Sequence, residues 1–129
     1  MRKAVILLVV LGIVCGCSKK ATEDTEPPQV VTTNPVNGSV DVDPSLTEIS
    51  VTFNEEMMDA CSWCMENKES FPQINGTPSY TDGNTKNIVP VKLESGKEYV
   101  IWINTSQYTN FKDKAGNSTV PYKLTFKTK

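Results

Sequence analysis

Three stretches of the chain have a period of two residues; in two of them apolar side chains alternate with polar ones, and in Glu98–Asn104 both faces carry apolar side chains. They are Thr47–Phe53, Glu98–Asn104 and the terminal run that begins at Tyr122. Such alternation is typical of β-strands, because successive side chains of a strand point to opposite faces. No segment of ten residues carries the apolar stripe of an amphipathic helix. The sequence therefore predicts an all-β fold.

Weaker strand-like segments and the turns between them complete the pattern. Further strands are expected at Gln29–Thr33, Cys61–Cys64, Thr77–Tyr80 and Asn87–Val91. Gly, Pro, Asn and Asp separate these segments, and Asn37-Gly38 is a strong turn dipeptide. About seven short antiparallel strands over residues 27–129 predict a single domain built as a two-sheet β-sandwich.

A local signature around Tyr99 supports the sandwich. Tyr99 stands at the start of the penultimate expected strand, six residues after Leu93 and across a turn that contains Gly96. This is the arrangement of a tyrosine corner, in which the phenol hydrogen-bonds back to the preceding loop. We therefore expect Tyr99 to be structural rather than functional.

The N-terminus has the pattern of a secretory signal peptide. A positive start with Arg2 and Lys3 precedes an apolar run over residues 4–14, which is shorter than the about 20 residues that span a bilayer. The following Val14-Cys15-Gly16-Cys17 resembles the lipobox of bacterial lipoproteins. The resemblance implies a signal peptide over residues 1–16 and lipidation of Cys17. An ordinary secretory cleavage nearby is the alternative.

Residues 17–26 are expected to form a lipidated cysteine and a flexible tether. Apart from Cys17, this segment contains no apolar side chain larger than alanine, so it has nothing to bury. Acyl chains on Cys17 would make the membrane a partner of the chain. Ser18, directly after that cysteine, resembles the outer-membrane sorting pattern. Cleavage would remove Arg2 and Lys3 and take the net charge from −2 to −4, which argues against nucleic acid as a partner.

Several segments in a fixed order resemble the bacterial Ig-like domain first known from surface-layer proteins. The segments are VTTNPVNG (31–38), VDP (42–44), ISVTFNEEM (49–57), LESGKEY (93–99), DKAGN (113–117) and LTFKT (124–128). The resemblance implies an Ig-like sandwich over roughly residues 28–128. It also implies use as a spacer, adhesion or accessory module in exported proteins, and it implies no catalytic residues.

The residue types give little support to an enzyme. The chain has no histidine, which removes the usual general base and most zinc sites, and we expect no cofactor. Cys61 and Cys64 have the C-x-x-C spacing of thiol oxidoreductases, but the flanking residues do not predict the helix that activates such thiols. We expect a disulfide between them, provided the segment turns. Two unpaired cysteines, or a periplasmic thiol–disulfide factor, are the alternatives.

Acidic residues fall in two connections that an Ig-like sandwich places at the same end. Glu55, Glu56 and Asp59 lie in the first connection, and Asp113 lies in the second. If these side chains converge, they offer the hard oxygen ligands that Ca²⁺ prefers. The spacing matches no known calcium loop, so solvated turn residues are the alternative, and no metal is assigned.

Aromatic residues supply a third set of candidates. Tyr108 and Phe111 lie in the long connection after the penultimate strand, where exposed rings can stack on sugars or contact a partner protein. We expect Trp63 and Trp102 to fill the core of the sandwich instead.

The sequence thus predicts a non-catalytic lipoprotein of the cell envelope, anchored to the outer membrane through Cys17. Its Ig-like domain would serve as a structural or binding module, with other envelope proteins or glycans as partners. The alternatives are a calcium- or glycan-binding recognition domain that uses the loop end, and a thiol–disulfide factor that uses Cys61 and Cys64.

Overall fold

The computed structural model describes residues 23–129. The expected signal peptide over residues 1–16 and the lipidation site Cys17 lie outside the described residues. Over residues 23–129 the chain forms nine strands and no helix. The strands are β1 (Val30–Asn34), β2 (Ser39–Val42), β3 (Glu48–Phe53), β4 (Trp63–Met65), β5 (Gln73–Ile74), β6 (Ser79–Thr81), β7 (Lys86–Lys92), β8 (Glu98–Ile103) and β9 (Tyr122–Thr128).

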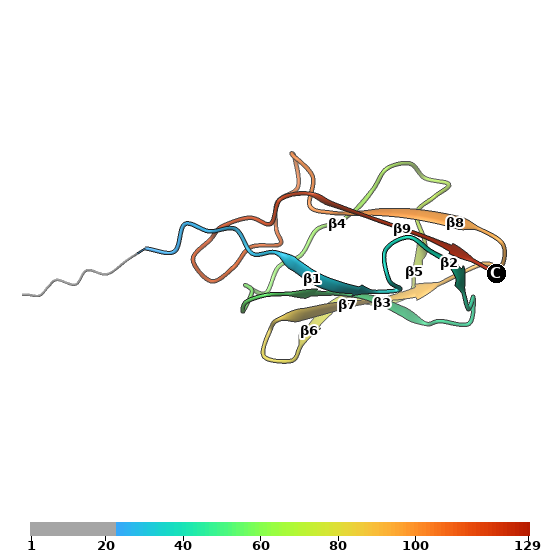
Figure 1. The fold of residues 1–129 in the computed structure, drawn as a ribbon, viewed down its shortest axis with the longest axis horizontal. Coiled ribbons are helices and arrows are strands. Elements are labelled where there is room, and N and C mark those ends of the chain that lie inside the picture. Colours follow the sequence, from blue (N-terminus) through green and yellow to red (C-terminus); the bar gives the residue numbers. More distant parts are fainter. Residues whose placement is uncertain (1–22) are drawn as a thin grey trace, which may run out of the picture.

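The strands form two sheets that face each other (Figure 1). The first sheet has the order β1-β3-β7-β5, and β6 also pairs with β7; the second has the order β2-β9-β8-β4. The predicted all-β Ig-like sandwich is confirmed. The described chain contains nine strands rather than about seven, and β2 runs parallel to β9 instead of antiparallel.

The two unexpected strands, β2 and β5, lie at sheet edges and are short. Val40 and Asp41 in β2 are both exposed, as are both residues of β5. Because neither strand buries one face, neither shows the alternation by which the sequence reveals a strand. Backbone pairing with β9 and β7 is what defines them.

The core is built from the apolar faces of the three alternating segments. The side chains at most 2% exposed include Ile49, Val51, Phe53, Tyr99, Ile101, Ile103, Leu124 and Phe126. They divide into two clusters, one around Tyr99 and Leu93 and one around Phe53 and Met57. Trp63 and Tyr122 pack against both clusters and join them. Burying one large apolar side chain contributes about 1.5–3 kcal/mol.

The turn predicted at Asn37-Gly38 carries the chain from the first sheet to the second. The backbone N–H of Ser39 donates to the carbonyl of Val36 at 3.0 Å, and Gly38 adopts a φ of +87°, which glycine tolerates at no steric cost. The Oδ1 of Asn37 accepts a hydrogen bond from the backbone N–H of Thr125 at 2.8 Å. The turn is thereby fixed to β9.

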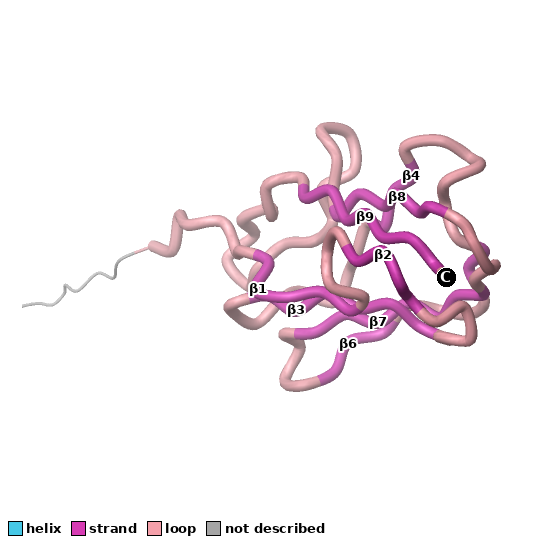
Figure 2. The backbone as a smooth tube through the Cα atoms, turned by 45° about the vertical axis from the view of Figure 1, so that its right-hand side comes forward, coloured by secondary structure: helices cyan, strands magenta, loops and turns pink. Residues whose placement is uncertain are grey.

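The chain enters the sandwich at one pole, and its C-terminus lies at the opposite pole (Figures 1 and 2). We define the tether pole as residues 23–29 together with the loops 54–62 and 105–119. At this pole Pro28 is buried, and the backbone N–H of Gln29 donates to Oδ1 of Asn54 at 2.9 Å. We define the far pole as the turns 43–47 and 93–97 with Lys129. The N–H of Gly96 donates to the carbonyl of Lys129 there.

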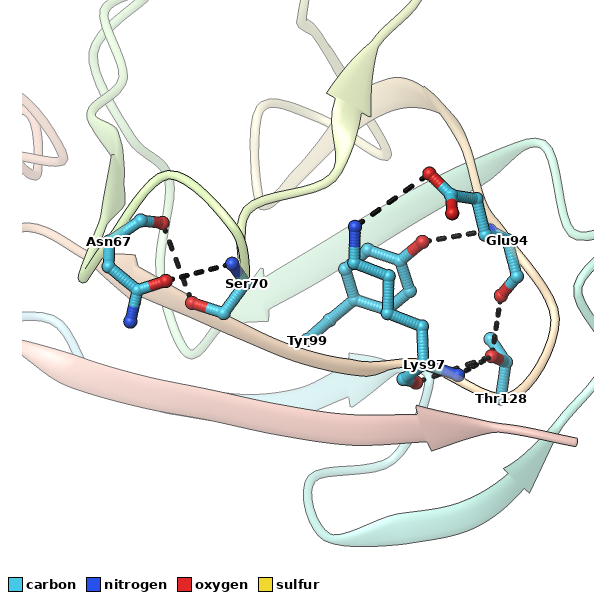
Figure 3. A network of polar contacts seen from close by, with 6 residues as sticks. All are labelled: Asn67, Ser70, Glu94, Lys97, Tyr99 and Thr128. Atoms are coloured by element: carbon cyan, nitrogen blue, oxygen red, sulfur yellow. Dashed lines mark hydrogen bonds and ion pairs between the residues drawn. The ribbon is translucent and has the colours of Figure 1, made fainter.

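Figure 3 shows the hydrogen bonds that close the far pole. The hydroxyl oxygen of Tyr99 accepts a hydrogen bond from the backbone N–H of Glu94 at 2.8 Å. The hydroxyl of Thr128 donates to the carbonyl of Glu94 at 2.6 Å and accepts from the N–H of Lys97 at 2.9 Å. The predicted tyrosine corner is therefore confirmed, and Tyr99 ties the turn 93–97 to the core.

Replacing Tyr99 by phenylalanine should destabilise the domain without changing its fold. The Glu94 N–H loses its acceptor at a partly buried position, which costs about 1 kcal/mol. For a domain of this size we expect the melting temperature to fall by about 4–8 °C. Tyr108→Phe is the matched control, because Tyr108 is 60% exposed, and it should leave the melting temperature unchanged. Equal effects of the two substitutions would contradict this role.

Candidate functional site

The long connection from β8 to β9 is organised by the side chain of Asn104. Asn104 is fully buried and has a φ of +65°, a backbone conformation that asparagine adopts more readily than most residues. Its Nδ2 donates to the carbonyls of Phe111 at 3.1 Å and Thr119 at 3.0 Å. Its Oδ1 accepts from the N–H of Phe111 at 3.0 Å. One amide therefore closes the loop at its base, a role that the sequence analysis missed.

Phe111 was a candidate binding residue, and the structure corrects that prediction. Its side chain is 0% exposed because the loop folds back over the end of the sandwich. The ring lies 5.3 Å from the ring of Phe53 and 5.6 Å from that of Trp63, edge-on to the indole. Phe111 is therefore a core residue. Tyr108, three residues earlier, remains exposed and available for contact.

The two tryptophans have different environments. Trp63 is half-buried and packs against both core clusters, as expected. Trp102 was also expected in the core, but it lies on the outer face of β8, between the buried Ile101 and Ile103. Its indole N–H donates to Oε1 of Glu66 at 3.1 Å. Both faces of this strand carry apolar residues, so alternation alone could not assign its inner face.

Acidic side chains meet at the tether pole. Carboxylate oxygens of Asp24, Glu55 and Asp113 lie within 4.8 Å of one another, and we call these three residues the carboxylate cluster. The sequence left open whether Glu55 and Asp113 converge or are solvated turn residues, and the structure brings them together. No pattern in the sequence indicated that Asp24, from the expected tether, would join them. The side-chain amide of Asn117 holds this segment by donating to the carbonyl of Asp24 at 3.0 Å.

The other two acidic candidates have different partners. Glu56 is exposed and forms an ion pair with Lys114, with an N–O distance of 3.6 Å. Asp59 accepts a hydrogen bond from Nδ2 of Asn84 at 2.8 Å. The structure therefore brings together two of the four acidic residues singled out from the sequence.

The members of the carboxylate cluster differ in electrostatic environment. Burial raises the pKa of Asp113, but hydrogen bonds from the side chain and N–H of Asn117 and the N–H of Ala115 outweigh it and leave this pKa below its usual value. Burial, followed by the charges of Asp113 and Asp24, raises the pKa of Glu55. Of Glu55 and Asp113, Glu55 is therefore the residue that takes up a proton first as the pH falls. With all three ionised, the oxygens suit a hard cation such as Ca²⁺.

Cys61 and Cys64 are free thiols in this structure, so the expected disulfide is not formed. Cys61 packs against the core cluster around Phe53. Cys64 stands directly opposite the outward-facing Trp102 in the β4–β8 pairing, and paired residues of an antiparallel sheet point to the same face. β4 is extended and Cys61 lies two residues before it, so the strand that carries Cys64 does not make the turn that a disulfide with Cys61 requires.

The environment of the thiols does not suit redox chemistry. Burial raises the pKa of both Cys61 and Cys64, and a hydrogen bond with Thr105 only partly offsets this for Cys64. A reactive thiol requires a lowered pKa, commonly supplied by a helix N-terminus. Residues 23–129 contain no helix, so nothing in the described part of the chain provides this activation.

The fold defines the class of the domain, an Ig-like β-sandwich. The family model of the bacterial Ig-like domain matches residues 24–128, and the chain belongs to this family. Two solved structures of a surface-layer protein are similar. Against the S-layer protein rSbsC the identity is 19% and the TM-score 0.49; against domains 1–6 of SbsC they are 17% and 0.43. Each match covers 78% of this chain and 13% of the other.

A search of curated proteins finds no match. In the described residues, no helix is long and apolar enough to cross a membrane.

Replacing Asn104 by alanine should be the most damaging single change in the loop. It leaves the buried N–H of Phe111 and the carbonyl of Thr119 without their partners, and each such group costs about 1–3 kcal/mol, whereas the carbonyl of Phe111 keeps the N–H of Thr119 as a donor. We expect a loss of about 3–5 kcal/mol in the free energy of unfolding, measured by urea denaturation. Asn110→Ala, in the same loop but exposed, is the control. A loss below about 1 kcal/mol for the Asn104 variant would refute this role.

The Glu55→Gln variant tests the electrostatics of the carboxylate cluster. A carboxyl whose folded-state pKa is raised destabilises the fold when ionised, so removing this charge should stabilise the domain at neutral pH. We expect the melting temperature at pH 7 to rise by about 2 °C, and the gain to vanish as the pH falls and wild-type Glu55 becomes protonated.

In the wild type, about 10 mM CaCl₂ should raise the melting temperature by about 5 °C, and the gain should be smaller in the Glu55→Gln variant.

Glu56→Gln is the control for both measurements, because Glu56 is exposed and lies in an ion pair with Lys114. It should respond to pH and to CaCl₂ as the wild type does. An equal response to calcium in all three proteins would show that the carboxylate cluster holds no cation.

Proposed function

We propose that this protein is a non-catalytic lipoprotein of the cell envelope whose Ig-like domain serves as a structural or binding module. In this proposal acyl chains on Cys17 anchor the chain to the membrane, and other envelope proteins or glycans are its partners. The observation that carries the proposal is the position of the two ends. The tether enters at one pole and the C-terminus lies at the other (Figure 1).

The docking of the tether segment supports an oriented module. Asp24 is held at the tether pole by Asn117, seven residues after Cys17, and seven extended residues reach about 25 Å. A domain anchored in this way would keep its tether pole near the membrane surface and direct its far pole away from it. More than one acyl chain is needed for stable anchoring, and a diacylated cysteine would meet this need. Ser18 favours the outer membrane.

The chemistry of the residues supports the non-catalytic part of the proposal. The chain has no histidine, and burial raises the pKa values of its two thiols at positions 61 and 64. The residues of the carboxylate cluster are better suited to holding a cation than to acid–base work on a substrate.

Calcium-dependent recognition is a second candidate function, favoured by the carboxylate cluster. A cation bound there would link Asp24 of the tether to Glu55 and Asp113 of the two loops. It would thereby stiffen the junction between anchor and domain. The calcium measurements above test this candidate.

Substitution of Cys17 tests the anchor. We expect the wild-type protein, extracted from its native membrane, to begin at Cys17 and to carry added acyl mass. Cys17→Ala should yield an unacylated protein that leaves the membrane fraction. Cys15→Ala is the matched control, because Cys15 follows Val14 rather than a small residue, and it should be acylated and retained as the wild type is. Intact mass spectrometry and fractionation are the measurements, and an unacylated wild type would remove the anchor from the proposal.

A further inference from the structure

A cavity of about 650 Å³ opens between the two sheets beside β4. β4 is the edge strand of its sheet, so the inner face of the sandwich is uncovered there. The lining reaches Val89, a core residue of β7, and includes Ile74 from β5 on the opposite sheet. The volume lies within the range of about 300–1,000 Å³ that is typical of small-molecule sites.

One wall of this cavity is apolar and aromatic. Trp63 and Met65 stand opposite the buried Ile103 and Ile101 in the β4–β8 register, so their side chains lie on the inner face of the sheet. The indole N–H of Trp63 donates to Oδ1 of Asn87 at 2.7 Å. The indole is therefore oriented before any ligand arrives. Met65 is 53% exposed, so this apolar wall opens to the solvent.

The other wall is the loop 105–110, which is polar. Its backbone is fixed, since the N–H of Tyr108 donates to Oγ1 of Thr105 at 3.1 Å and the N–H of Asn110 donates to Oγ of Ser62 at 3.0 Å. Among residues 23–129, no hydrogen bond engages the side-chain amides of Gln107 and Asn110 or the hydroxyl of Tyr108. These groups line the cavity on a loop held by hydrogen bonds, and they are available to bind a ligand.

The charge of the lining selects the ligand. None of the fourteen lining residues, all within the described chain, is Asp, Glu, Lys or Arg, so an ionic ligand would find no counter-charge. An uncharged pyranose has an apolar face of C–H groups and an edge of hydroxyls. The C–H face can stack on the aromatic wall, and the hydroxyl edge can form hydrogen bonds with the amide and hydroxyl side chains of the polar wall.

We propose that this cavity binds an uncharged glycan. A sugar ring stacks on Trp63 and Tyr108, and its hydroxyls hydrogen-bond to Gln107 and Asn110. The inference rests on the proposed function only in naming glycans as partners in the envelope. Binding to the cavity does not depend on the lipid anchor.

Tryptophan fluorescence of the full chain carrying Cys17→Ser tests the proposal, with the β-linked tetrasaccharide of N-acetylglucosamine and maltotetraose as probes. With Trp102→Phe added, Trp63 is the sole indole, and its emission should change saturably below about 10 mM of at least one probe. With Trp63→Phe added instead, the remaining Trp102 on the outer face should not respond.

The double variant Gln107→Ala and Asn110→Ala guards against a trivial loss of folding, because both side chains are exposed. It should keep the wild-type melting temperature and bind the responding probe at least tenfold more weakly. No emission change with either probe, or unaltered affinity in the double variant, overturns the proposal. Either result would leave the acylation of Cys17 intact, so the failure of this site is distinguishable from failure of the anchored module.

Discussion

The side-chain amide of Asn104 holds in place the loop on which every candidate site depends. Its three hydrogen bonds, to Phe111 and Thr119, close the base of a connection that would otherwise cost considerable entropy to order. Once the base is closed, Phe111 enters the core and the carboxylate of Asp113 is buried at the tether pole. The same constraint positions residues 105–110 as the polar wall of the cavity beside β4.

The two poles of the sandwich are stabilised by different means. At the far pole, the hydroxyl of Tyr99 and the side chain of Thr128 satisfy the backbone of the turn 93–97. At the tether pole, the side-chain amides of asparagines satisfy the backbone groups of the loops. Three carboxylates also lie close together there, and no positively charged side chain of the described residues forms an ion pair with them. The tether pole therefore retains electrostatic repulsion that a cation or a proton on Glu55 would relieve.

Prediction succeeded where the information is local. The alternation in β3 and β9 identified the core residues Ile49 and Leu124, because successive side chains of a strand point to opposite faces. It failed for Trp102, since both faces of β8 are apolar. It also failed for the thiols, because residues i and i+3 can form a disulfide only where the chain turns, and the strand that contains Cys64 is extended.

By itself, the sequence determined the all-β class, the turn at Asn37-Gly38, the tyrosine corner and the resemblance to the bacterial Ig-like family. The first three depend on residues a few positions apart, whose geometry the backbone dictates, and the resemblance depends on the order of several short segments along the chain. Only the tertiary structure decided that Asp24 joins Glu55 and Asp113, that Phe111 is core, and that the apolar wall beside Trp63 faces the loop 105–110. These contacts join segments that lie far apart in the chain, and only the packing of the two sheets brings them together.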